Sequence, residues 1–233
     1  MRSLAEAAAE AADCERCGLA AGRTQVVYGV GDPYAQLMFI GEGPGFHEDK
    51  QGEPFVGAAG QLLNKMLGEI GIARSDVYIA NVVKCRPPGN RDPLPEEIDS
   101  CAPWLHEQVR LIDPKVIATL GRFAGGWMLG RQIAITRIRG QRFPLDGRVL
   151  IPTLHPAAVL RSGGKQLEDL RADFEEMRKA LEEPRAPRSV GPEAAPGEPD
   201  DLGATDAAGT ADTPAAMDVA TPPEPSDSQL ELF

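Results

Sequence analysis

Residues 77–83 read V-Y-I-A-N-V-V, an apolar run that predicts a buried β-strand with one polar residue, Asn81, near its carboxyl end. Comparable β-rich runs predict strands at residues 25–28, 37–40, 116–120 and 148–153. Helical patterns predict helices from the N-terminus to about residue 21 and at residues 60–71, 95–112, 122–129 and 165–181. This alternation predicts an α/β fold whose mostly parallel central sheet is covered by helices on both faces.

Three loop segments with polar or glycine residues follow the ends of predicted strands. They read G-E-G-P-G-F-H-E-D-K-Q-G-E-P-F-V-G-A-A-G at residues 41–60, N-V-V-K-C-R-P-P-G-N-R-D-P at residues 81–93 and P-T-L-H-P at residues 152–156. In parallel sheets, ligands bind at the carboxyl ends of the strands. We therefore expect side chains of the three segments to meet in one pocket.

The chain has four cysteines, spaced C-x2-C and, after a long gap, C-x15-C: Cys14, Cys17, Cys85 and Cys101. Four thiolates are what a tetrahedral metal ion or an iron–sulfur cubane requires. The N-terminus has no apolar leader segment, so we expect a reducing cytoplasmic setting, in which metal binding is favoured over two disulfides. Zinc binding, two disulfides and four unrelated buried thiols remain open as alternatives at this point.

Most of the negative charge lies near the C-terminus. The net charge is −11, which taken alone argues against a nucleic-acid partner. However, residues 183–233 hold eleven acidic and two basic residues, so residues 1–182 carry a net charge of only −2. The same tail has nine prolines and few large apolar residues, a composition typical of disorder. We expect a folded domain at residues 1–182, a disordered acidic linker at 183–228 and a terminal peptide at 229–233.

The three segments and the cysteine spacing together resemble the iron–sulfur family 4 uracil-DNA glycosylases, over roughly residues 10–182. The resemblance implies a three-layer α/β/α uracil-DNA glycosylase-like fold and a [4Fe–4S] cluster on the four cysteines. It also implies removal of uracil from DNA in base excision repair. Such an enzyme flips the base into a pocket and hydrolyses its N-glycosidic bond, which leaves an abasic site.

Three residues are candidates for holding the extruded base. The Phe55 ring is suited to stacking on uracil. The Asn81 amide donates and accepts hydrogen bonds, which matches uracil O4 and N3–H, whereas cytosine presents the opposite polarity. By resemblance, His155 faces uracil O2 and stabilises the charge that develops there as the bond breaks.

The glycine loop at the start of the first segment supplies the remaining candidates. Gly41 and Gly43 permit a close approach of backbone to the base. In family 1 enzymes an Asp that helps to activate water stands at the place of Gly43, and family 4 lacks it. Glu42 and Glu48 are the nearest carboxylates and are therefore the further catalytic candidates.

DNA contacts are expected beyond the pocket. Arg86 and Arg91 lie in the second segment, and Leu160, Arg161 and Lys165 follow His155 in a predicted loop that can fill the vacated stack and hold phosphates. A related subgroup forms covalent DNA adducts through a histidine in an inserted basic loop. Residues 87–93 hold no histidine, so we expect a free abasic product.

The last five residues, Q-L-E-L-F, resemble the peptide that docks in the bacterial sliding clamp. The matching positions are Gln229, Leu230, Leu232 and Phe233. A flexible tether that ends in an anchor raises the local concentration of an enzyme at its target. The clamp is therefore an expected partner.

The leading interpretation is a monomeric, monofunctional uracil-DNA glycosylase that acts on single- or double-stranded DNA in the cytoplasm, at the nucleoid, without a membrane. Three alternatives stay open from the residues. They are a related glycosylase with a different base preference, a catalytically silent iron–sulfur DNA-binding module, and a zinc structural protein.

Overall fold

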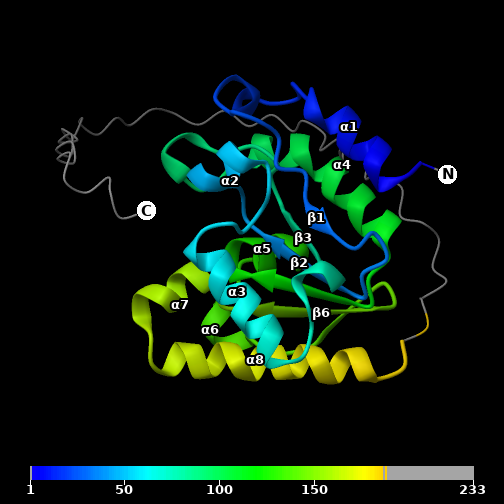
Figure 1. Ribbon diagram of the computed structural model, residues 1–233, viewed down its shortest axis with the longest axis vertical. Helices are drawn as coiled ribbons and strands as arrows, with labels where there is room; N and C mark the ends of the chain where they lie inside the picture. Colours follow the sequence, from blue (N-terminus) through cyan, green and yellow to red (C-terminus); the bar gives the residue numbers. More distant parts are fainter. Residues whose placement is uncertain (1, 186, 188–233) are drawn as a thin grey trace, which may run out of the picture. The chain divides into compact units, whose positions relative to one another are not determined.

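The computed structural model describes residues 2–185 and 187 (Figure 1). Within them, the strands form one six-stranded sheet in the order β1-β3-β2-β4-β6-β5. The strands are β1 (Val30–Gly31), β2 (Leu37–Gly41), β3 (Tyr78–Asn81), β4 (Val116–Leu120), β5 (Phe143–Leu145) and β6 (Arg148–Thr153). The four central strands, β3, β2, β4 and β6, are parallel, and the two edge strands are antiparallel to their neighbours. The predicted α/β class and mostly parallel sheet are confirmed.

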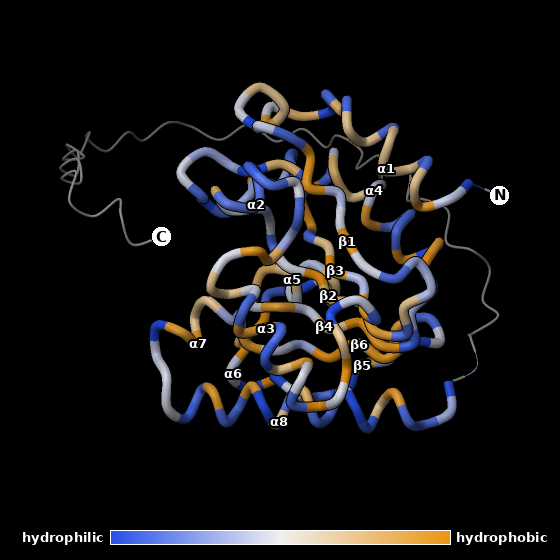
Figure 2. Tube along the Cα trace, viewed as in Figure 1, coloured by the Kyte–Doolittle hydropathy of each residue, from blue (hydrophilic) through white to orange (hydrophobic). Residues whose placement is uncertain are grey.

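Helices cover both faces of this sheet, as Figure 1 shows with α1 and α4 on one side and α3 and α8 on the other. The α-helices are α1 (Leu4–Ala12), α2 (Phe46–Gln51), α3 (Ala58–Glu69), α4 (Pro95–Ile112), α5 (Gly121–Met128), α6 (Ile135–Ile138), α7 (Pro156–Ser162) and α8 (Lys165–Glu182). Short 3-10 turns lie at Gly18–Ala21, Arg74–Asp76 and Pro88–Asn90. Figure 2 shows hydrophobic strands in the interior and a hydrophilic outer side on α8.

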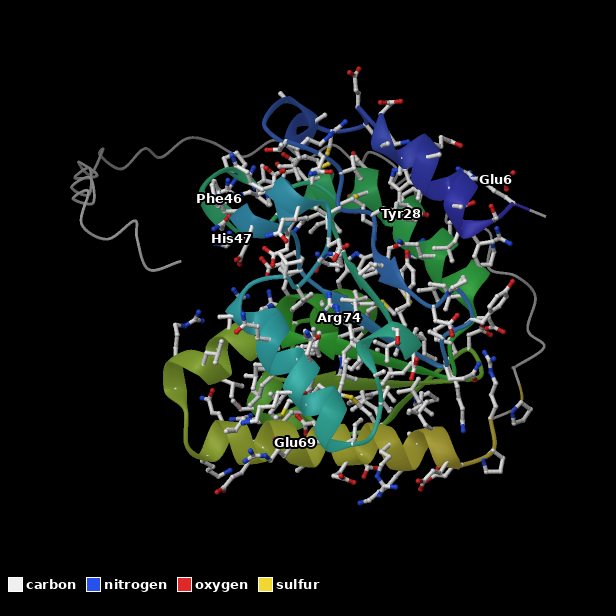
Figure 3. All side chains as sticks on the ribbon, in the orientation of Figure 1. Glu6, Tyr28, Phe46, His47, Glu69 and Arg74 are labelled. Carbon is white, nitrogen blue, oxygen red and sulfur yellow. The ribbon has the colours of Figure 1, made fainter. Side chains whose placement is uncertain are left out.

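Polar contacts fix several helices at their ends. A capping box between Ser3 and Glu6 begins α1. Glu69, at the end of α3 (Figure 3), accepts hydrogen bonds from Arg171 on α8, which ties two helices of the same layer together. Pro95 at the first turn of α4 needs no hydrogen-bond acceptor for its nitrogen.

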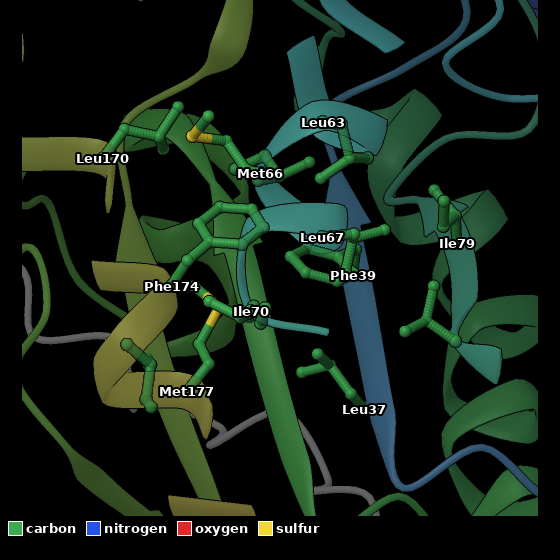
Figure 4. Close-up of a cluster of buried hydrophobic side chains, with 14 of the residues drawn as sticks. Leu37, Phe39, Leu63, Met66, Leu67, Ile70, Ile79, Leu170, Phe174 and Met177 are labelled. Atoms are coloured by element: carbon green, nitrogen blue, oxygen red, sulfur yellow. The ribbon is translucent and has the colours of Figure 1, made fainter. Parts of the chain in front are cut away.

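Alternate residues along the central strands face two separate cores. On β2, Leu37 and Phe39 pack with α3, α7 and α8, whereas Met38 and Ile40 pack with α1, α4 and α5. Figure 4 shows the first of these cores, in which the Phe39 and Phe174 rings stack with their centroids 5.6 Å apart. Because both faces are covered, the strands read as continuous apolar runs in the sequence.

Two features of the β1 edge differ from the sequence prediction. The strand predicted at residues 25–28 is wrong: Val27 N–H donates to the Lys84 carbonyl, and the edge strand is β1 instead. A glycine at residue 31 explains why β1 pairs with β3 here. The φ of Gly31 is +134°, and a Cβ at this residue would stand 1.9 Å from the Val77 carbonyl oxygen. The backbones can pair only where such an approach is possible.

Two segments predicted as loops contain short helices. Residues 46–51 form α2, which begins after Gly45 and ends at Gly52 in the left-handed region, with φ of 77°. Residues 156–162 form α7, for which His155 is the N-cap and Pro156 the first residue. Neither helix is long enough for a hydrophobic period to be recognised in the sequence.

The C-terminal predictions lie largely outside the described residues. Helix α8 ends at Glu182, and Arg185 still forms an ion pair with Asp113. Residue 186 and residues 188–233 are not described, so most of the predicted linker at 183–228 and all of the predicted clamp peptide at 229–233 lie outside the structure. Every helix in the described part of the chain is too short or too polar to cross a bilayer.

The first turn of α3 generates a stability prediction. A Cβ at Gly60 would stand 1.7 Å from the Phe55 carbonyl oxygen, so Gly60→Ala forces a backbone shift and destabilises the protein by about 2–3 kcal/mol. Gly68 lies on the exposed side of the same helix, where an added methyl would have no neighbouring atom within 4 Å, so Gly68→Ala stabilises by about 0.5–1 kcal/mol. Urea unfolding of both variants measures the difference; equal effects would contradict the assigned packing.

Candidate active site

The backbone of Gly41 lies directly against Asn81 and Phe55. Parallel pairing sets Gly41 of β2 opposite Asn81 of β3. A Cβ at Gly41 would stand 2.3 Å from Asn81 Oδ1 and 2.8 Å from the Phe55 ring. Val82 and Val83 donate to the carbonyls of Gly41 and Glu42, so the two strand ends remain aligned beyond the sheet. The structure thus brings together residues 40 positions apart at one edge of the sheet.

Phe55 is buried and occupies a strained loop. Its φ is +55°, in the region that non-glycine residues rarely adopt. Two neighbours hold this conformation: Glu48 Oε1 accepts from the N–H groups of Val56 and Gly57 at 3.1 and 3.4 Å. Arg74, labelled in Figure 3, donates to the Pro54 carbonyl at 2.6 Å. Glu48 is therefore a brace for the Phe55 loop.

Asn81 presents an unpaired acceptor in a buried position. Its side chain is 1% exposed, and Oδ1 has no hydrogen-bond partner in the described structure. Its backbone carbonyl accepts from the buried Lys84 Nζ at 2.8 Å, and Lys84 in turn contacts Gln108 on α4. An unpaired buried acceptor costs about 1–3 kcal/mol unless a ligand supplies a donor. Asn81 Oδ1 is therefore free to accept a hydrogen bond from a donor that reaches this edge of the sheet.

His155 is held at the start of α7 by its own ring. Nδ1 accepts from Ala157 N–H at 3.1 Å, so the proton of a neutral imidazole resides on Nε2. The ring lies 5.7 Å from the Phe55 ring, centroid to centroid. On its other side, Gly121 approaches so closely that a Cβ there would stand 3.1 Å from His155 Cβ. The residues of all three predicted segments thus meet at one place.

The electrostatic surroundings keep His155 neutral. Burial, and then the nearby positive charge of Arg161, lower its pKa to about 4, while Glu48 opposes the shift. At neutral pH the side chain is a hydrogen-bond donor through Nε2 and carries no charge.

Burial shifts the pKa of Glu42 in the opposite direction, because it disfavours the charged form of a carboxyl group as it does that of an imidazole. Burial, and then the neighbouring carboxyl of Asp92, raise the pKa of Glu42 to about 7, while Arg122 opposes the shift. Arg122 Nη2 and Asp92 Oδ2 form an ion pair at 2.9 Å. Glu42 is thus able to take up or release a proton near neutral pH. Gly43, next along the chain, packs on Val83, where a Cβ would stand 2.8 Å from Cγ2.

The predicted DNA contacts fall into two groups. Arg91 makes a two-pronged pair with the buried Glu97, at 2.9 and 2.6 Å, and Lys165 pairs with Asp169 at 2.9 Å. Within the described residues, Arg86 and Arg161 have no ion pair. Leu160 is 50% exposed on α7, one residue before Arg161. Leu160 and Arg161 therefore lie on a helix and not on the loop that was predicted.

The four cysteines line one pocket, together with Arg23, Lys84 and Trp104. Three sulfurs receive donors: Trp104 Nε1 lies 3.4 Å from Cys14, the Lys84 N–H 3.2 Å from Cys101, and an Arg23 nitrogen 3.7 Å from Cys85. Burial raises the pKa of Cys85 to about 11 and raises that of Cys101, while the nearby Arg23 and Lys84 oppose the two shifts. Among the described residues, no group of three or more His, Cys, Asp or Glu side chains is arranged to hold a single metal ion.

The comparisons with known proteins agree with one another. Residues 28–182 match the model of the uracil DNA glycosylase superfamily. A type-4 uracil-DNA glycosylase from Thermotoga maritima is 47% identical over 72% of this chain and 87% of its own length. Type-4 uracil-DNA glycosylases from Archaeoglobus fulgidus and Sulfurisphaera tokodaii are 43% and 42% identical over 76% and 79% of this chain, and 92% and 88% of their own lengths.

The chain belongs to the type-4 uracil-DNA glycosylases. The resemblance drawn from its motifs is confirmed, and so is the fold that the resemblance implied.

The sequence did not indicate several parts of this candidate site. Two of these parts contact His155: the backbone of Gly121 packs on its Cβ, and the N–H of Ala157 donates to its Nδ1. The third part is the Asp92–Arg122 ion pair, which lies near Glu42. For Gly121 a signal was available, because it follows the apolar run at residues 116–120 and so lies at the same edge as the other strand ends. The charge pair had no such signal, since nothing in the sequence indicates that residues 92 and 122 are close.

The pKa of His155 provides a test of the site's electrostatics. NMR titration of the imidazole should give a midpoint near pH 4, against the ordinary value of 6.5. Arg161→Gln should raise the midpoint because it removes a positive neighbour, and Glu48→Gln should lower it because it removes a negative one. A wild-type midpoint at the ordinary value, unmoved by either substitution, would contradict the described environment.

Proposed function

We propose that the protein removes uracil from DNA with the base held by Gly41, Phe55, Asn81 and His155. As a type-4 uracil-DNA glycosylase it is a hydrolase of N-glycosyl bonds that serves base excision repair. The observation that carries the residue assignment is the unpaired Asn81 Oδ1, buried beside Phe55 and the Gly41 backbone.

Base selection follows from the Asn81 amide. Oδ1 accepts from N3–H of uracil, and the amide nitrogen donates to O4. Cytosine has an acceptor at position 3 and a donor at position 4, so it would leave both groups unpaired at about 1–3 kcal/mol each. The braced Phe55 ring supplies the stacking surface. Gly41 and Gly43 let Asn81, Phe55 and Val83 pack against their backbone, which would bring that backbone close to the base.

Bond cleavage is assisted by His155. Negative charge develops on uracil O2 as the N-glycosidic bond breaks, and the neutral imidazole donates from Nε2 to that oxygen. The contact between Nδ1 and Ala157 N–H supports this role because it fixes the tautomer before the base arrives.

Of the two candidate carboxylates, the contacts favour Glu42. Glu48 is occupied with the backbone of the Phe55 loop, whereas Glu42 lies next to Gly41 with a pKa of about 7. In its ionised form Glu42 orients water or stabilises the positive charge on the sugar. Glu48 then acts by holding Phe55 in place.

DNA is held by the cations around the pocket. Arg86 and Arg161 are better placed for phosphates than Arg91 and Lys165, whose charges are already offset by Glu97 and Asp169. The exposed Leu160 fills the space that the extruded base vacates. The product is a free abasic site, since residues 87–93 contain no histidine nucleophile.

The cysteines fit a [4Fe–4S] cluster. They lie in one pocket, and hydrogen-bond donors to three sulfurs stabilise thiolates, as around protein-bound clusters. Cys14, Cys17, Cys85 and Cys101 would hold the cluster, which would tie the N-terminal arm to the start of α4. No step of the reaction needs it.

The tail is proposed to recruit the enzyme. The acidic linker, predicted to begin at residue 183, would begin only after Arg185, because Glu183 and Arg185 pair with Arg142 and Asp113. Gln229, Leu230, Leu232 and Phe233 would bind the bacterial sliding clamp and so raise the local concentration of the enzyme at DNA. Removal of residues 229–233 should abolish clamp binding, and unchanged binding would contradict this role. We further infer a monomer that works in the cytoplasm, at the nucleoid, since its substrate is DNA and its cysteines require reducing conditions.

Excision from a labelled uracil oligonucleotide tests the proposed function. His155→Ala should lower the single-turnover rate about 10²- to 10³-fold, because one donor to a developing charge is lost. Asn81→Ala should lower the rate about tenfold or more, with DNA binding mostly intact. Unchanged rates in both variants would contradict the assignment.

His106→Ala is the matched control, since His106 lies exposed on α4 and stacks on Trp127. It should excise uracil at the wild-type rate. In the same assay the wild-type rate should rise with pH through about 7 as Glu42 ionises, and Glu42→Gln should remove that transition.

The cluster has a test that does not depend on activity. Purified protein should be coloured and should contain iron and acid-labile sulfide. Cys85→Ser should lose the colour, the iron and the sulfide, and its free energy of unfolding should fall by several kcal/mol. Ser100→Ala, which lines the same pocket without a thiol, should keep its iron. Zinc in place of iron in anaerobically purified protein would contradict the proposal.

A further inference from the structure

One exposed aromatic side chain beside the glycine loop has no part in the site described above. Phe46 begins α2 directly after Gly45, and 44% of its surface is exposed. Single exposed hydrophobic residues are common and need no explanation on their own. Two further observations set Phe46 apart.

The first observation is charge. Lys50 Nζ lies 5.3 Å and the Arg86 guanidinium 5.1 Å from the centre of the Phe46 ring. Lys50 belongs to α2, whereas Arg86 comes from the segment that follows Asn81. Within the described residues neither cation has an ion pair. In contrast, Arg91, Arg122 and Lys165 each form one.

The second observation is position. Phe46 lies five residues after Gly41, the residue that contacts Asn81 and Phe55. Figure 3 shows Phe46 and His47 together on the outer side of α2, and their rings meet edge to face at 5.5 Å. Asn90 Oδ1 accepts from Arg86 Nε at 2.7 Å, which orients this guanidinium toward the ring. The aromatic ring and its two cations are thus a preformed group on α2, the helix whose Glu48 contacts the backbone of the Phe55 loop.

This combination is what a single nucleic-acid strand recognises. Bases stack on exposed aromatic rings regardless of sequence, and unpaired cations beside the ring neutralise the phosphates on either side. Lys50 has a long flexible stem, so its ammonium can move from the ring to a phosphate while a base stacks on Phe46. In an intact duplex the neighbouring base stays stacked within its own strand, so stacking on Phe46 adds less binding free energy there.

We propose that Phe46, with Lys50 and Arg86, binds the nucleotide next to the extruded uridine on the same strand and so favours single-stranded DNA. The proposal rests on the proposed function. It adds a second base-binding position to the site, outside the uracil pocket, and assigns it to Phe46, a residue of the first motif segment to which the sequence analysis gave no role.

The test measures binding separately from excision. Single-stranded oligonucleotides with a stable abasic analogue, flanked on one side or the other by fluorescent 2-aminopurine, are titrated with protein. Phe46→Ala should weaken binding about tenfold and abolish the fluorescence change of the stacked 2-aminopurine, whereas Phe46→Trp should retain both. Lys50→Ala and Arg86→Ala should each reduce the slope of log K against log salt by about 0.7.

The control variant is Tyr34→Ala. Tyr34 is another exposed aromatic, with 81% of its surface accessible, but it precedes β2 and so lies at the amino ends of the strands. It should bind single strands like the wild type. On uracil substrates, Phe46→Ala should need about tenfold more single-stranded DNA to reach its half-maximal rate. Its rate at saturating DNA should be unchanged. On duplex DNA the increase in the half-saturating concentration should be smaller.

Wild-type binding and fluorescence in Phe46→Ala would overturn the inference, and so would an equal loss on duplex and single strands. Failure of the proposed function has a different signature. In that case the wild-type protein would leave uracil in place, while the fluorescence titration would still report whether Phe46 stacks on a base.

Discussion

The contact between Gly41 and Asn81 is the constraint on which the site depends. Parallel pairing of β2 and β3 fixes their register, and only a residue without a side chain allows the Asn81 amide and the Phe55 ring to reach the same place. The sheet therefore does more than support the loops. It sets a backbone surface and a buried amide side by side before any ligand binds, which is the preorganisation that selective binding requires.

Each residue of the pocket is held by a contact that is itself fixed. Glu48 holds the strained Phe55 loop, Ala157 N–H sets the tautomer of His155, and Lys84 Nζ holds the Asn81 carbonyl. Lys84 precedes Cys85, and its backbone N–H faces the Cys101 sulfur. Residues 81–85 therefore contact both the cysteine pocket and the candidate active site through one short segment.

The distribution of charge explains how a protein with a net charge of −11 can act on DNA. The described part of the chain pairs many of its cations internally, as with Arg91 and Glu97. Cations without an ion pair, Arg86 and Arg161 among them, remain near the carboxyl ends of the strands. These two cations are available to phosphates although the whole molecule is acidic, because salt screens charges that lie farther away than about 10 Å.

The sequence by itself determined the four central parallel strands, the helices α3, α4, α5 and α8 and the residues of the motifs, because apolar periodicity and strand ends are local properties. It did not indicate β1, β5, α2, α6 or α7, and the N-terminal helix predicted to about residue 21 ends at Ala12. Residues 95–112, 116–120 and 148–153 form the predicted elements at the predicted bounds. Only the tertiary structure decided how the ends meet. The strained φ of Phe55, the neutral state of His155, the raised pKa of Glu42 beside Asp92 and the cations around Phe46 all depend on segments far apart in the chain, and no local pattern encodes their distance.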